Sequence, residues 1–252
     1  MELPEHLHAL RRDGELLAAT ASRTGLGVPI PTCPEWQMRD LVRHMGDVHR
    51  WAGAHVAERR AEPIRKAVEV AGPLPDDDGL LEWYGQGLDR LVRTLESADR
   101  DLECWTFLPA PSPVAFWARR QAHETGIHRA DAESATGSIS PFPAPFATDG
   151  IDELLFGFLG RTKSDGSGDE PPRTLHLHAT DTPAEWVVRI DSGRFEASRE
   201  HARADCSVRA SASDLYLLVW NRRSPDGLEV LGDTSILDFW RDTVQISWSR
   251  GR

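Results

Sequence analysis

A change of hydrophobic periodicity part-way along the chain most constrains how it can fold. In four stretches before residue 138, apolar residues recur at steps of three and four, the spacing that gives an α-helix one buried face. From residue 173 onward the period becomes two, as where Leu175 and Leu177 alternate with two histidines. Such alternation is typical of strands with one buried face. The chain is therefore predicted to fold as a helical domain followed by a domain that contains a sheet.

The four helices are expected at residues of about 3–24, 38–61, 79–97 and 117–133. Connections of unequal length join them, which predicts a four-helix bundle with at least one long crossover. One connection, from Val28 to Trp36, holds three prolines and is expected to be an extended loop. In such bundles, metal sites are built from inward-facing side chains on neighbouring helices.

The second half differs in composition and in hydrophobic periodicity. Residues 138–150 hold three prolines and two phenylalanines among small residues, a composition typical of a linker. After it we expect a helix at 151–161, a flexible polar loop at 163–172, strands within 173–197 and at 207–210, and helices at 212–220 and 236–241. The predicted fold class is two-domain α+β: a bundle over residues 1–137, a linker over 138–150 and a small α+β domain over 151–252.

Charge, hydropathy and cysteine content indicate which partners, cellular location and thiol chemistry to expect. A formal net charge of −11 argues against a nucleic-acid or anionic-membrane partner, because both require basic patches. No apolar run has the length of a membrane span and the N-terminus lacks an export signal, so a cytoplasmic location is expected. Cys33, Cys104 and Cys206 are odd in number and scattered, which predicts reduced thiols rather than disulfides or a CxxC metal site.

One stretch, Trp117 to Glu133, contains a spacing that indicates chemistry. Glu124 and His128 stand four residues apart, so on a helix they lie one turn above each other on a single face, which Asp131 extends. Together they can supply one oxygen and one imidazole nitrogen to a metal ion. The alternative interpretation is a surface pair on a solvated helix, which contributes little.

Helix geometry limits which histidines can complete such a site. His123 and His128 are five residues apart, which separates them by roughly 140° around a helix axis, so they cannot grip one ion as HExxH proteases do. A third ligand must come from elsewhere, and the second expected helix carries His44, His49 and His55. His44 falls on the apolar stripe of that helix and His49 shares a face with apolar residues, so spacing leaves both open. His55, near the helix end, is the weaker candidate.

Several motifs, taken in order, resemble the mycothiol-dependent maleylpyruvate isomerase family, whose N-terminal bundle belongs to the DinB-like group. They are VPIPTCPEW at 28–36, DLVRH at 40–44, VHRW at 48–51, HETGIHRAD at 123–131, LVWNRR at 218–223, DG at 226–227 and LGD at 231–233. The resemblance runs through nearly the whole chain. It implies a DinB-like four-helix bundle followed by a sterol-carrier-like α+β domain.

The resemblance also implies site residues. The family's metal ligands correspond to His44, Glu124 and His128, holding a divalent ion, zinc above all. An arginine of the second domain, Arg222 or Arg223, is implied to bind the cofactor and close the site, although Asn221 stands where the family is expected to have glycine.

Two further residues of the 117–133 stretch are candidates for the reaction. Asp131 could accept a hydrogen bond from an imidazole nitrogen of His128, and Arg120 could hold the Glu124 carboxylate or an acidic substrate. The alternatives are an exposed helix carboxylate for Asp131 and a surface ion pair for Arg120.

Three protein ligands leave one position open, the arrangement of a catalytic metal. A low-molecular-weight thiol such as mycothiol would bind there and lose its proton, because a cation favours thiolate over thiol. The thiolate could then add to a small electrophilic substrate, for cis–trans isomerisation or for thiol transfer. Metal-dependent hydrolysis is one alternative, and a non-catalytic ligand-binding protein is another. Cys33 has no basic neighbour to activate it and is not expected to be the nucleophile, and the sequence does not fix the oligomeric state.

Overall fold

The computed structural model describes residues 1–161 and 171–246. The chain divides into two compact units, the first ending at Ser140 and the second beginning at Pro141. Most of the loop predicted at 163–172 lies outside the described residues. Every helix within them is too short or too polar to span a lipid bilayer.

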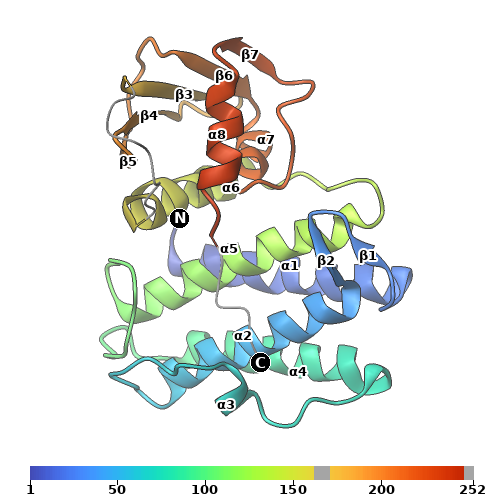
Figure 1. Cartoon of the computed structure of the whole chain (residues 1–252). Helices are drawn as coiled ribbons and strands as arrows, with labels where there is room; N and C mark the ends of the chain where they lie inside the picture. Colours follow the sequence, from blue (N-terminus) through green and yellow to red (C-terminus); the bar gives the residue numbers. More distant parts are fainter. Residues whose placement is uncertain (162–170, 247–252) are drawn as a thin grey trace. The chain divides into compact units, whose positions relative to one another are not determined.

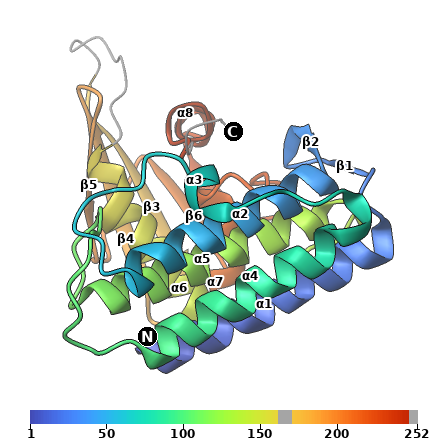
Figure 2. The same ribbon diagram turned by 90° about the horizontal axis from the view of Figure 1, so that it is seen from below.

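Four long helices make up the first unit, as the periodicity predicts (Figure 1). They are α1 (Leu3–Thr24), α2 (Met38–Ala57), α4 (Asp77–Ser97) and α5 (Pro113–Ser134). Helix α1 packs against α5 and α4, while α2 packs against α4 and α5. Figure 2 shows the same four helices side by side from below. The helical bundle is therefore confirmed.

Local sequence signals explain where these helices begin. At α2, the Gln37 and Asp40 side chains form a reciprocal capping box, and the Asp76 carboxylate caps α4. Helix α5 begins at Pro113, earlier than expected, because the Ser112 hydroxyl accepts a hydrogen bond from the Ala115 amide at 3.2 Å. Its residues from Val114 to Glu133 are almost all buried.

Two expectations for the first unit need correction. The segment at 28–36 is not a plain extended loop, because its ends pair as a short antiparallel hairpin of β1 (Pro29–Ile30) and β2 (Cys33–Gln37). Helix α2 ends at Ala57 rather than Ala61, and a four-residue helix, α3 (Val68–Ala71), interrupts the connection to α4.

The second unit is built on a mixed five-stranded sheet in the order β5-β4-β3-β6-β7. Its strands are β3 (Arg173–Ala179), β4 (Glu185–Asp191), β5 (Arg194–Ser198), β6 (Cys206–Ala210) and β7 (Glu229–Gly232). Strand β3 is antiparallel to β4 and parallel to β6. With helices α7 (Ala212–Val219) and α8 (Ser235–Thr243), this confirms the α+β class, although β7 was not predicted.

The proline-rich stretch at 138–150 is helical in its second half. Helix α6 runs over Ala144–Asp152 and continues as a π-helical segment, Glu153–Phe158, and a 3-10 turn, Leu159–Arg161. Proline is tolerated in a first helical turn, and Phe146 and Ile151 are fully buried here, so the segment gains tertiary packing that a linker would lack.

Asn221 ends helix α7 in the left-handed conformation, with φ of 59°. The Asn221 amide donates to the Leu218 carbonyl and the Arg222 amide to the Leu217 carbonyl, the pattern of a Schellman motif. Asparagine tolerates this conformation, so the glycine expected from the family is replaced without loss of the turn. We expect Asn221→Val to have a free energy of unfolding about 1–2 kcal/mol lower than that of Asn221→Gly, because both variants lose the hydrogen bond from the Asn221 side chain to the Val244 carbonyl and only valine resists the left-handed conformation. Urea unfolding of both variants checks this, and equal stability would contradict it.

Candidate metal centre

His44 of α2 and Glu124 and His128 of α5 come together in the first unit. The Glu124 Oε1 atom lies 3.5 Å from His44 Nε2 and 3.4 Å from His128 Nε2. The two imidazole rings are 4.9 Å apart between centroids and close to perpendicular. One ligand atom from each residue lies within 4.8 Å of the other two, so the group can surround a single ion.

These separations fit a metal site better than a set of hydrogen bonds. Nitrogen–oxygen hydrogen bonds have donor–acceptor distances of about 2.7–3.2 Å, shorter than either contact to Glu124 Oε1. Ligands bound tetrahedrally at about 2.1 Å from zinc are separated by about 3.4 Å. Two imidazoles and one carboxylate are also a donor set that Zn²⁺ accepts.

Asp131 orients one of the two imidazoles. Its Oδ2 atom lies 2.9 Å from Nδ1 of His128, which leaves Nε2 on the side of Glu124. The Thr32 hydroxyl, from the β1–β2 hairpin, donates to the other Asp131 oxygen at 2.6 Å. The Asp131 side chain is fully buried, so it is not an exposed helix carboxylate. A carboxylate behind a histidine is the usual outer partner of a metal-binding imidazole.

Arg120 holds the free oxygen of the Glu124 carboxylate. Its Nη2 atom donates to Glu124 Oε2 at 2.9 Å, which leaves Oε1 directed at the two histidines. The Arg120 side chain is 2% exposed and the Glu124 side chain 8%. The pair therefore does not belong to the exposed class of ion pairs, which contribute little.

Electrostatics keep Glu124 ionised and favour a proton on His128. Burial alone would raise the pKa of Glu124, but its interactions with His128, His44 and Arg120 hold that pKa well below its usual range. Burial alone would lower the pKa of His128, but Asp131 and Glu124 outweigh it and raise the pKa to about 9. A cation takes the place of that proton when it binds to imidazole nitrogen.

The other histidines near this stretch lie outside the group. His49 is fully buried, and its Nε2 atom lies 2.9 Å from the Thr125 hydroxyl. His55, also fully buried, contacts the Trp51 carbonyl through Nδ1 and accepts from the Ile64 amide. His123 packs edge-on against His6. The expectation that His44 lies on the buried stripe was wrong, because its side chain is 24% exposed, on the border between the core of the bundle and its surface.

Two family models match this chain. The mycothiol maleylpyruvate isomerase N-terminal domain matches residues 7–133, and the corresponding C-terminal domain matches residues 145–239. The chain belongs to the mycothiol maleylpyruvate isomerase family. The family resemblance inferred from the sequence motifs is thereby confirmed.

Solved structures agree with this assignment at the level of the fold. The mycothiol-dependent maleylpyruvate isomerase is 15% identical with a TM-score of 0.59, and a variant of it with one histidine replaced by alanine is 14% identical with a TM-score of 0.61. Each comparison covers 91% of this chain and 93% of the other. No curated protein is similar enough in sequence to match the chain.

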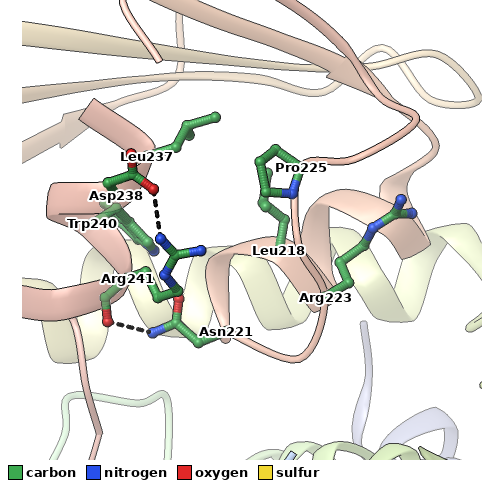
Figure 3. Close-up of a pocket in the computed structure, with 8 residues that line it drawn as sticks. All are labelled: Leu218, Asn221, Arg223, Pro225, Leu237, Asp238, Trp240 and Arg241. Atoms are coloured by element: carbon green, nitrogen blue, oxygen red, sulfur yellow. Dashed lines mark hydrogen bonds and ion pairs between the residues drawn. The ribbon is translucent and has the colours of Figure 1, made fainter. Parts of the chain in front are cut away.

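Arg222 and Arg223, which the family resemblance implies, belong to the second unit. Arg222 Nη1 donates to the Trp220 carbonyl at 2.8 Å, and Arg223 forms an ion pair with Asp214. Figure 3 shows Arg223 at the rim of a pocket of this unit, with its guanidinium turned away from Asp238 and Arg241. The remaining lining residues are Leu218, Asn221, Pro225, Leu237 and Trp240. That Arg222 or Arg223 binds a cofactor stays a prediction.

Sequence reasoning missed two residues that lie beside the candidate metal group, both from the hairpin. Thr32 supports Asp131, and the Trp36 ring stacks at 6.1 Å from the His128 ring and lies 5.1 Å from the His44 ring. Both stand in the segment 28–36, whose motif already carried the family resemblance. The family motif at 28–36 could therefore have pointed to Thr32 and Trp36. The prediction of an extended loop there gave no reason to expect contacts with Asp131 and His128.

Buried neutral histidines should make the stability of this protein fall in acid. Burial and the charge of Arg50 lower the pKa of His49 to about 3, and burial lowers that of His55. Because the folded pKa of His49 lies below the unfolded value, the unfolded chain takes up the proton first as pH falls. Stability should thus decline below about pH 6.5, on the order of 1 kcal/mol per pH unit.

Urea unfolding of the chelator-treated protein between pH 6.5 and 5 measures this dependence. In that window folded His128 stays protonated, because its folded pKa is raised to about 9, whereas in the unfolded chain a histidine is only about half protonated at pH 6.5. His128 therefore opposes the decline near pH 6.5 and adds almost no slope by pH 5, equally in the two proteins compared. A His49→Gln variant, which keeps a donor for Thr125, should show a shallower decline. Equal slopes in the two proteins would contradict the assignment to His49.

Proposed function

We propose that this protein is a metal-dependent enzyme that uses a low-molecular-weight thiol, mycothiol, to isomerise or to modify a small electrophilic substrate. The observation that carries the proposal is the position of two imidazole nitrogens, 3.4 and 3.5 Å from one oxygen of Glu124. Membership of the family supports the thiol, because the solved relative is described as mycothiol-dependent.

His44, Glu124 and His128 would hold the divalent ion, with zinc as the best match to this donor set. A bound ion with an open position would supply an electrophilic centre that favours the thiolate form of a coordinated thiol at neutral pH. Without such an ion, a low-molecular-weight thiol is mostly protonated at pH 7, because the pKa of a free thiol is about 8.5.

The chain's own residues prepare the site for that ion. Asp131 holds the proton of His128 on Nδ1, so that Nε2 carries the lone pair. Arg120 neutralises part of the Glu124 charge and fixes the rotation of the carboxylate. The Trp36 ring covers His44 and His128 on one side, which limits the access of water to the two imidazoles.

An activity assay with the metal-loaded full chain tests the proposal. Maleylpyruvate, the substrate named for the solved relative, is supplied with mycothiol, with glutathione or without thiol, and isomerisation is followed by absorbance. We expect turnover with mycothiol only, lost after removal of the metal and unchanged in His8→Ala, whose side chain is exposed on α1.

Other results would overturn parts of the proposal. Isomerisation at the same rate without thiol would remove the thiol from the mechanism. Hydrolysis of an ester or amide substrate by the metal-loaded protein, together with no effect of mycothiol on its thermal unfolding, would favour the hydrolase alternative. Full activity after metal removal would contradict the metal site.

A further inference from the structure

The second unit contains a separate group of metal-ligating side chains on its sheet. His176 and His178 stand two residues apart on β3, so both point to the same face. Glu185 is the first residue of β4 and lies directly opposite His178 in the antiparallel pair. His201 comes from the connection between β5 and β6. One ligand atom from each of the four lies within 4.8 Å of all the others.

The topology of the sheet brings His201 to this face. Strand β5 lies outside β4, whereas β6 lies on the far side of β3, so the connection over residues 199–205 has to cross both central strands. It begins beside the first residues of β4 and ends where Cys206 pairs with Leu175 on β3. His201 therefore reaches Glu185 from the next connection but one along the chain, 16 residues away.

Contacts at both ends hold this connection in place. At its start, Arg199 forms an ion pair with Asp152 of the α6 helix. At its end, the Asp205 carboxylate accepts from the amide and the hydroxyl of Thr174 at 2.8 and 2.7 Å. Thr174 lies two residues before His176 on the same face of β3. The position of His201 is thus defined by the fold on either side of it.

The donor atoms converge on the Glu185 carboxylate. His176 Nε2 and His201 Nδ1 lie 2.8 and 2.6 Å from Oε2, and His178 Nδ1 lies 3.1 Å from Oε1. Exposure increases outward across the group, from 8% for the His176 side chain to 79% for that of His201. An ion can therefore enter from solvent while the inner ligands stay fixed.

We propose that His176, His178, Glu185 and His201 form a second metal site, for a divalent transition ion such as Zn²⁺. Three imidazoles exclude Ca²⁺ and Mg²⁺, which take oxygen ligands. Four protein ligands fill a tetrahedral shell, which is the arrangement of a structural rather than a catalytic site. A bound ion would fasten the 199–205 connection to β3 and β4 and would stabilise this unit independently of the centre at Glu124.

A hydrogen-bonded cluster is the competing explanation, because the nitrogen–oxygen distances of 2.6 to 3.1 Å are those of hydrogen bonds and one carboxylate has enough lone pairs to accept from three neutral imidazoles. Binding of an ion would move these ligand atoms apart, to about 3.4 Å. Zn²⁺ titration separates the two. The chelator-treated full chain is titrated at pH 7.5 against a chromophoric competitor, alongside a His178→Ala/His201→Ala variant, a His44→Ala/His128→Ala variant and a His8→Ala control.

We expect the wild type and the His8→Ala control to bind two equivalents of Zn²⁺ and each double variant to bind one. The wild type should also show slower amide hydrogen exchange at residues 199–205 with Zn²⁺, an effect lost in the His178→Ala/His201→Ala variant only. A single His201→Ala change removes an exposed side chain, so it keeps the fold and should weaken the second equivalent at least tenfold.

Equal Zn²⁺ stoichiometry in the wild type and in the His178→Ala/His201→Ala variant would overturn the second site. So would unchanged hydrogen exchange at 199–205 on addition of Zn²⁺. If Zn²⁺ binding is lost only in the His44→Ala/His128→Ala variant, the result supports the metal centre at Glu124 and rejects the second site.

Discussion

Replacing Glu124 with glutamine should abolish metal-dependent activity and weaken metal binding by more than about 100-fold. Loss of an outer partner of a metal ligand costs about 10–100-fold in affinity, and loss of a charged ligand should exceed that. Glu124 Oε1 lies 3.5 Å from His44 Nε2 and 3.4 Å from His128 Nε2, and Glu124 is the only negatively charged member of the three, so the amide removes the negative ligand of the group. Competition titration with a chromophoric chelator measures the affinity.

The matched control is Glu96→Gln on α4, which removes a carboxylate whose side chain is 50% exposed. It should leave affinity and activity unchanged. Circular dichroism of Glu124→Gln should match that of the wild type, because the glutamine has the same shape. Wild-type metal affinity in a folded Glu124→Gln protein would contradict the assignment of Glu124 as a ligand.

Replacing Arg129 with methionine should destabilise the first unit by about 3–5 kcal/mol, the usual cost of removing one partner from a buried ion pair. The Arg129 side chain is 1% exposed and lies 2.6 Å from Glu133 and 3.4 Å from Asp13 of α1. It also donates to the Ser140 carbonyl at 2.7 Å. Without the guanidinium, these carboxylates stay buried with fewer partners. Urea unfolding monitored by tryptophan fluorescence gives the change.

Arg11→Met provides the comparison at an exposed ion pair of the same bundle, between α1 and α4. Arg11 pairs with Glu96 at 3.3 Å, but both side chains are about half exposed, so its loss should cost less than about 1 kcal/mol. If Arg129→Met and Arg11→Met lower the free energy of unfolding by similar amounts, the role of burial at Arg129 is contradicted.

The elements of the bundle could be predicted because their signals are local. Apolar spacing located α1 and α4 within a few residues, and the four-residue step between Glu124 and His128 placed both on one face of α5. Helix periodicity does not depend on what the helix packs against, which is why these predictions hold.

Features that depend on tertiary contacts could not be predicted in this way. Spacing alone left His44 and His49 open, because both lie on faces of α2 that carry apolar residues. In the structure the fully buried one, His49, contacts Thr125, and the half-buried one, His44, faces Glu124. Only the position of α5 decides between them.

The second cluster shows the same division. The two-residue spacing of His176 and His178 was visible in the sequence as strand alternation. Glu185 joins them through the register of β3 with β4, and His201 through the crossover to β6. Neither the register nor the strand order is encoded in the local pattern, which indicates only that the two histidines share one face of a strand.

The absorption spectrum of the Co²⁺-substituted protein, recorded with and without mycothiol, tests the central claim most directly. Co²⁺ bound by His44, Glu124 and His128 should give visible bands of a four-coordinate ion. Added mycothiol should produce a sulfur-to-cobalt charge-transfer band in the wild type and in the His178→Ala/His201→Ala variant, and none in Glu124→Gln. A spectrum that mycothiol leaves unchanged, or a charge-transfer band that persists in Glu124→Gln, would contradict a thiol-binding metal at this centre.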